Sequence, residues 1–203
     1  MNITNRLLLA AGLSAAVLFT RGFADDAKEE PAFKATCPVS GQPAIEESSR
    51  EYKGKKVYFC CQNCPKAFEA DTDKFATKAN HQLFETGQIV QVACPFTGKQ
   101  VNPDTAVDVG GVKVAFCCDD CKAKYEAAAA DEQVALVFGD ISKGFTLQTL
   151  CPVSGEAIDP KVSVEHEGKK VYFCCDKCPA AFEKDPAKYL GKLPQFAEEK
   201  KAE

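Results

Sequence analysis

The sequence predicts an α+β fold made of three small modules in tandem, each a β-hairpin followed by a short helix. The first observation is a repeat, because the 203-residue chain has 12 cysteines in three equal sets, each displaced by 57 residues from the last. The second is a hairpin pattern in each repeat, and the third is a helix signal after it. A fixed period of this length indicates repeated structural units. We therefore assign residues 31–87 to module 1, 88–144 to module 2 and 145–193 to module 3.

The repeat is clearest around the cysteines. A Cys-Pro-hydrophobic-Ser/Thr-Gly turn opens each repeat, and a Cys-Cys-x-x-Cys cluster follows after 22 intervening residues. Residues 37–68 and 151–182 share 19 identities over 32 positions without a gap, which chance does not produce. Module 2 has diverged further, with Ala115 where its neighbours have tyrosine.

Strand signals follow each opening turn. The hairpin turns contain Gly54, Gly111 and Gly168. Glycine is favoured there because a tight hairpin turn needs a positive φ. The return strands, residues 57–59, 114–116 and 171–173, are rich in the β-branched and aromatic residues that strands prefer. Residues 88–93 and 145–150 alternate in polarity before the first cysteine of modules 2 and 3, and this alternation predicts further strands.

A helix is predicted to begin at the last cysteine of each set. Pro65 and Pro179 follow that cysteine in modules 1 and 3, and proline suits the first turn of a helix. We expect the aromatic side chains of the strand and helix to fill the core: Tyr58, Phe59, Phe68 and their equivalents. Phe75 and Tyr189 are expected to cover that core.

The two ends of the chain differ from the repeats. Residues 7–19 form an apolar run behind Arg6, shorter than the roughly 18–20 residues that span a membrane. We interpret residues 1–24 as a signal peptide cleaved near Ala24. The alternative is an uncleaved leader that anchors the protein to a membrane. Export, most simply to a bacterial periplasm, reaches an oxidising compartment, so disulfides are a rival use of the cysteines. The charged tail, residues 194–203, is expected to be loose.

Composition limits the function classes. The net charge is −4 with no basic block, which disfavours a nucleic-acid partner. The sequence contains no Ser–His–acid set and no paired carboxylates at a readable spacing, so we do not expect an enzyme. Of the 2 histidines, His81 falls in a connector and His166 is interpreted as a surface residue rather than an extra ligand.

The cysteine spacing itself favours metal binding. One cysteine lies on a turn and the others where a strand runs into a helix, which is how small metal modules bring thiolates together. A 57-residue unit without tryptophan has a marginal core, so a crosslink would decide whether it folds. Metal and disulfides would both serve. Neighbouring strand residues face opposite sides, so Cys61 is expected to point away from the site unless the chain has already turned.

The pattern Cys37-x22-Cys60-x3-Cys64, with VYF before the second cysteine and an aromatic residue after the last, resembles the TRASH/YHS group of treble-clef-like modules. The resemblance covers all three units, and it implies one heavy-metal ion per module. The family turn has a second cysteine where this chain has Ser40, Thr97 or Ser154, so three thiolates remain. Soft sulfur ligands suit copper(I) or zinc. The implied ligands are Cys37, Cys60, Cys64, Cys94, Cys117, Cys121, Cys151, Cys174 and Cys178. A fourth ligand could be water, or Cys61, Cys118 or Cys175.

Three functions are consistent with this pattern. The first is an exported protein that holds zinc or copper(I) in each module for metal trafficking, buffering or resistance. The second is a scaffold in which metal or disulfides only stabilise modules that bind a membrane or exported protein. The third is thiol–disulfide exchange, for which Cys61 and Cys64 have the CxxC spacing without the surrounding thioredoxin-like pattern.

Overall fold

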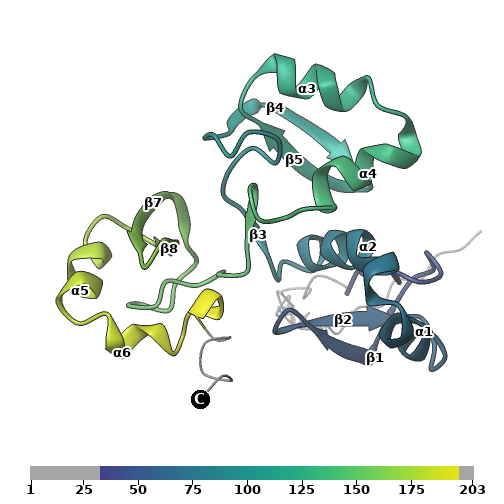
Figure 1. Ribbon diagram of the computed structural model, residues 1–203, viewed down its shortest axis with the longest axis horizontal. Helices are drawn as coiled ribbons and strands as arrows, with labels where there is room; N and C mark the ends of the chain where they lie inside the picture. The colour runs from purple at the N-terminus through teal and green to yellow at the C-terminus, as the bar shows by residue number, and fades with distance from the viewer. Residues whose placement is uncertain (1–32, 197–203) are drawn as a thin grey trace, which may run out of the picture. The chain divides into compact units, whose positions relative to one another are not determined.

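The computed structural model describes residues 33–196, which form the expected mixed α+β fold of small hairpins and short helices (Figure 1). Module 1 contains β1 (Ile45–Tyr52), β2 (Lys55–Phe59), α1 (Cys64–Ala70) and α2 (Thr72–Glu85). Module 2 contains β3 (Val90–Gln91), β4 (Asn102–Val109), β5 (Val112–Phe116), α3 (Asp119–Glu126) and α4 (Ala130–Phe138). Module 3 contains β6 (Phe145–Thr146), β7 (Asp159–His166), β8 (Lys169–Phe173), α5 (Cys178–Lys184), α6 (Ala187–Leu190) and the 3-10 helix η1 (Pro194–Phe196).

The proposed leader lies outside the described residues, as does the tail beyond residue 196. Within the described part, no helix has the length and apolar character needed to cross a membrane.

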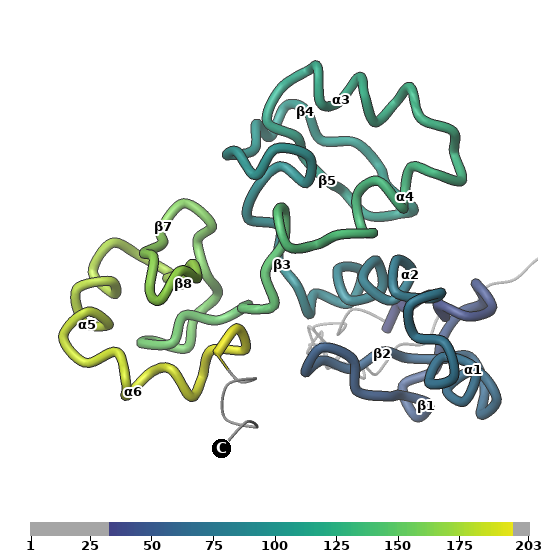
Figure 2. The backbone as a smooth tube through the Cα atoms, viewed as in Figure 1, coloured from purple at the N-terminus to yellow at the C-terminus, as the bar shows by residue number. Residues whose placement is uncertain are grey.

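The three hairpins are built alike, and Figure 2 shows the same backbone path from hairpin to helix in each module. Each pairs antiparallel strands, with a register shift at equivalent positions of β1, β4 and β7. The turn glycines Gly54, Gly111 and Gly168 have φ values of 70°, 94° and 73°, as their sequence context predicted. The residue before each also has a positive φ, which gives the turn the twist that matches two paired strands.

A repeated aromatic pair fills the space between hairpin and helix. Phe59 on β2 and Phe68 on α1 are buried, with ring centroids 5.4 Å apart. The equivalent rings in modules 2 and 3 lie 5.5 and 5.6 Å apart. Phe75 and Tyr189 pack against the helix aromatic of their modules, as expected. Because strand residues alternate between faces, this packing fixes which side of the return strand faces the helix.

The helix prediction is right for modules 1 and 3 and wrong for module 2. Helices α1 and α5 begin at Cys64 and Cys178, with proline next. Helix α3 instead begins at Asp119, so Cys121 lies inside its first turn. Two acidic residues, Asp119 and Asp120, occupy this turn, and negative side chains are favoured at a helix N-terminus.

A glutamine, buried in modules 1 and 3 and half-buried in module 2, closes the outer edge of each return strand. In module 3, the side-chain amide of Gln148 donates to the backbone oxygen of Tyr172 at 2.6 Å, and its oxygen accepts from the Tyr172 N–H at 3.0 Å. Gln91 makes the same pair of bonds with Ala115 in module 2. Gln82, on α2, makes them with Tyr58 in module 1. These side chains satisfy backbone groups that an edge strand would otherwise leave unpaired.

The alternating segments before the first cysteines form much shorter strands than predicted. Only β3 and β6, two residues each, are strands, and they pair with each other. Gln91 and Gln148 contact the return strand of their own module through their side chains.

The described residues form two hydrophobic cores. One joins modules 1 and 2, where α2 packs on α4: Asn80 donates to the Phe138 backbone oxygen at 2.8 Å, and the buried His81 ring meets the Phe138 ring edge-on. His81 therefore belongs to a packed interface rather than to a loose connector. The second core lies in module 3 and includes the buried Phe196. The expectation of a loose tail is thus wrong for residues 194–196, because Phe196 adds apolar area to a small core.

Candidate metal centre

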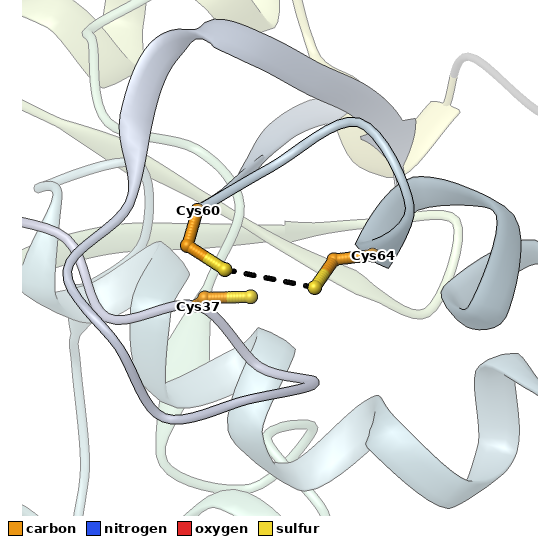
Figure 3. Close-up of side chains that lie close together, drawn as sticks. All are labelled: Cys37, Cys60 and Cys64. Carbon is orange, nitrogen blue, oxygen red and sulfur yellow. Dashed lines mark hydrogen bonds between the residues drawn. The ribbon is translucent and has the colours of Figure 1, made fainter.

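Three thiols converge at the strand–helix junction of module 1. Cys37 opens the turn of residues 37–41, Cys60 directly follows β2, and Cys64 is the first residue of α1. Figure 3 shows the three sulfur atoms directed toward one another. All three lie within 4.8 Å of each other, and the Cys60 and Cys64 sulfurs are 3.6 Å apart. This arrangement could hold a metal ion.

The same triad recurs in the other two modules. The three groups are Cys37, Cys60 and Cys64; Cys94, Cys117 and Cys121; and Cys151, Cys174 and Cys178. The equivalent sulfur pairs are 3.6 and 3.7 Å apart. Four sulfurs around a zinc ion, at bond lengths of about 2.3 Å, lie about 3.8 Å from one another. A disulfide instead needs a separation of about 2.05 Å, and all twelve cysteines are free thiols. The sulfur spacing fits a shared soft ion.

Backbone hydrogen bonds hold the turn that the first cysteine of each triad opens. The N–H of Gly41 donates to the oxygen of Cys37 at 2.8 Å, and the N–H of Cys37 donates to the oxygen of Gln42 at 2.8 Å. The φ of Gly41 is 74°, a value that favours glycine. Modules 2 and 3 repeat this turn at Gly98 and Gly155. The turn keeps the first cysteine fully buried and directed at the other two thiols.

A hydroxyl group contacts each triad. It belongs to the serine or threonine that stands where the TRASH/YHS turn has its second cysteine. Ser40 Oγ lies 3.1 Å from the sulfur of Cys60, and this oxygen also accepts the Gln42 N–H. The matching hydroxyl–sulfur distances are 3.3 Å for Thr97 and 3.1 Å for Ser154. The same hydroxyl lowers the pKa of the first cysteine of its triad, because a hydrogen bond to sulfur stabilises the thiolate form. The signal in the sequence was the recurrence of Ser or Thr at this position in every repeat.

The first cysteine of each triad is the most acidic. Burial raises its pKa, but hydrogen bonds from the turn hydroxyl and from backbone N–H groups outweigh burial. They lower the pKa of Cys37 and Cys94 to about 7 and that of Cys151 to about 6. These side chains are therefore partly or largely thiolate near neutral pH.

The last cysteine of each triad behaves in the opposite way. Burial and contacts with the other cysteines raise the pKa of Cys64 and Cys178, and they raise that of Cys121 to about 12. These thiols keep their protons until a cation replaces them, so metal binding is coupled to proton release.

The fourth cysteine of each module lies beside its triad. Cys61 is exposed, yet its sulfur is 3.5 Å from that of Cys64. Cys118 lies 3.7 Å from Cys117, and Cys175 contacts both Cys174 and Cys178 at 3.8 and 3.7 Å. Alternation along an ideal strand would have turned this residue away from the site; the chain has instead already bent at the end of the return strand, which is the exception that the sequence left open.

Neither histidine joins a triad within the described residues. The ring of His166 packs edge-on against Phe182, as the ring of Tyr52 packs against Phe68 in module 1. His166 therefore occupies an aromatic position of the core edge.

Comparison with known proteins gives no relative from which a function could be transferred. The chain matches no protein-family model, no curated protein and no solved structure. The TRASH/YHS assignment thus remains a resemblance carried by the cysteine spacing, while the triads themselves indicate three tandem metal-binding modules.

Proposed function

We propose that the protein binds one soft heavy-metal ion, zinc or copper(I), in each module and holds these ions for trafficking, buffering or resistance outside the cytoplasm. The observation that carries the proposal is the convergence of three thiols within 4.8 Å at the same structural position in three modules. In this proposal the protein is a metal carrier or store and not an enzyme. The location outside the cytoplasm rests on the leader sequence, residues 1–24.

The chemistry of the triads supports a soft cation. Copper(I) and zinc bind thiolate ligands well, whereas harder ions such as magnesium and calcium prefer oxygen ligands. Cys37 supplies thiolate character near neutral pH, and Ser40 supplies a hydrogen-bonding hydroxyl at Cys60. Cys64 releases its proton on binding. The triad therefore combines one ligand that is already partly thiolate near neutral pH, Cys37, with two thiols, Cys60 and Cys64, that can lose their protons when the ion binds.

A structural role for the metal is the second candidate, and the small core of module 3 favours it. That core contains seven buried residues, two of which are the triad cysteines Cys151 and Cys178. A core in which ligands are part of the packing depends on the ion for its stability. Structural zinc contributes about 10–16 kcal/mol in small zinc-binding peptides. In this version the modules present a surface to a membrane or exported protein.

The test is metal and thiol analysis on protein purified from its native compartment. We expect three equivalents of metal per chain, with reduced thiols. In the Cys37→Ser, Cys94→Ser and Cys151→Ser variants we expect loss of one equivalent each, and the two intact modules serve as internal controls. Metal-free protein with all twelve thiols oxidised would contradict the proposal. Metal that a chelator removes without unfolding favours transport or storage, whereas loss of the fold on chelation favours the structural role.

A further inference from the structure

The cysteines of each module form a series from buried to exposed. In module 1, Cys37 is 0% exposed and Cys64 8% exposed, Cys60 is half-buried, and Cys61 is exposed. Modules 2 and 3 begin equally deep, at Cys94 and Cys151, and end at an exposed fourth cysteine. A molecule in solution therefore meets the fourth thiol of each site first.

The fourth thiol also touches the site that the others form. Its sulfur lies 3.5–3.7 Å from a triad sulfur in every module. It precedes the last triad cysteine by three residues and directly follows the second, so the same bend that brings the triad together places it there. The contact recurs in all three repeats, including the diverged module 2, and this recurrence argues against an accident of packing.

We propose that Cys61, Cys118 and Cys175 are exchangeable ligands, through which each triad takes up its ion and passes it to a partner that presents a thiolate. The inference rests on the proposed function, since it assumes that the triads bind metal. The partner is any molecule with an accessible cysteine thiol, whether a protein or a small thiol. The three triad sulfurs hold the ion while the partner thiolate replaces the exposed fourth sulfur.

The exchange step involves no oxidation. The partner sulfur forms a bond to the ion as the bond between the ion and the sulfur of Cys61 breaks, and the proton of the incoming thiol passes to the departing Cys61 thiolate. Uptake is the reverse. The buried Cys37 cannot be approached by the partner first, because its side chain has no exposed surface. The ordered exposure thus sets the order in which ligands are replaced.

Alkylation of zinc-loaded wild-type protein tests the inference. Iodoacetamide modification is followed at each cysteine by peptide mass spectrometry, with and without zinc, during a titration with EDTA. We expect zinc to slow alkylation of Cys61, Cys118 and Cys175 by about tenfold or more, because the free thiolate is the nucleophile and a sulfur bound to zinc has lost that reactivity. As EDTA removes zinc, these residues should become reactive before Cys37, Cys94 and Cys151.

The two possible failures are distinguishable in the same experiment. If the triad cysteines are protected but the fourth cysteine reacts as fast as in metal-free protein, this inference is overturned and the proposed function stands. If zinc protects no cysteine, the proposed function itself fails.

A variant provides a second readout that does not depend on alkylation. In the combined Cys61→Ser, Cys118→Ser and Cys175→Ser variant, we expect the same number of zinc ions, one fewer sulfur per ion by X-ray absorption, and loss of zinc to EDTA about tenfold faster or more. The matched control replaces Cys37, Cys94 and Cys151 with serine, and it should lose the ions altogether. An unchanged sulfur count and release rate in the first variant would rule out these residues as ligands.

Discussion

Modules 1 and 2 pack through α2 and α4 around one core of 17 buried residues, which also includes Phe145 at the start of module 3, whereas the rest of module 3 closes over a core of seven. The hairpin and the triad are nearly the same in all three, so the difference lies in what surrounds them. In module 1, the 14-residue helix α2 carries both the glutamine that closes β2 and the residues that dock on module 2. Module 3 has the four-residue α6 and η1 instead. The same metal site is therefore embedded in two environments that differ in how much packing supports them.

Metal removal should separate the two regions most strongly. We expect chelation of the loaded protein to unfold module 3, since its seven-residue core includes two ligands, while α2 and α4 keep their shared core. A structural zinc ion contributes about 10–16 kcal/mol to the folding free energy of small zinc-binding peptides, so its removal is enough to unfold a small module. Hydrogen exchange resolved by peptide measures this as loss of amide protection in residues 151–196. Cys151→Ser should reproduce the effect in module 3 alone, and equal loss of protection in all modules would contradict the comparison.

A pair of phenylalanine substitutions probes the cores directly. Phe138 packs against His81 and Phe84 across the interface of modules 1 and 2, and Phe182 fills the core of module 3. Replacing either with alanine should lower the free energy of unfolding by about 3–5 kcal/mol. Phe138→Ala is expected to weaken modules 1 and 2 together, and Phe182→Ala module 3 alone. Thermal denaturation gives the loss of stability, and hydrogen exchange shows which modules it affects. A Phe138→Ala variant in which only module 2 loses protection would contradict the shared core.

The glutamines that close the strand edges give a smaller effect. Gln148→Ala removes the partners of the Tyr172 N–H and carbonyl in module 3, and Gln82→Ala does so for Tyr58 in module 1. Leaving buried polar groups without partners costs about 1–3 kcal/mol. We expect each variant to lower the unfolding temperature of its own core. A larger loss for Gln100→Ala, whose side chain is exposed, than for Gln82→Ala would argue against this role.

Acidification should release the ions from all three triads. Protons compete with the ion at each thiolate, so the affinity for metal falls as the pH falls. The last cysteine of each triad has a raised pKa and is already protonated near neutral pH, and the first cysteine gains a proton as the pH falls through a pKa of about 7 in modules 1 and 2 and about 6 in module 3. We therefore expect the affinity to fall more steeply with pH once the first cysteine is protonated. Bound metal measured against pH, in chains with a single intact triad, checks this, and an affinity that does not change from neutral to acidic pH would contradict it.

Much of the site followed from the sequence because the repeat specifies it locally. The positions of Cys37, Cys60 and Cys64 relative to a turn, a strand end and a helix start are fixed by short-range signals such as Gly54 and Pro65. The closeness of Cys61 to the triad did not follow, since alternation along an ideal strand puts neighbours on opposite faces and the bend after β2 ends that alternation. Local sequence patterns therefore identify the ligands well, but they do not predict how the backbone bends between one ligand and the next.

What depends on long-range packing could not be predicted in the same way. Nothing local marks Gln82 as the partner of Tyr58, because in modules 2 and 3 that role belongs to Gln91 and Gln148, which precede their cysteines. The buried position of His81 depends on the docking of α2 on module 2, a contact between residues distant in sequence. Only the folded chain shows that modules 1 and 2 share a core.

The central claim is that each triad holds one soft metal ion. The most direct measurement combines native mass spectrometry with X-ray absorption on the metal-loaded chain, because together they give the number of ions and the atoms bound to them. The account predicts three ions per chain in an environment of sulfur ligands, and two ions when Cys151 is replaced by serine. A chain that binds no ion while its thiols are reduced, or whose ions are bound by oxygen and nitrogen alone, would contradict it.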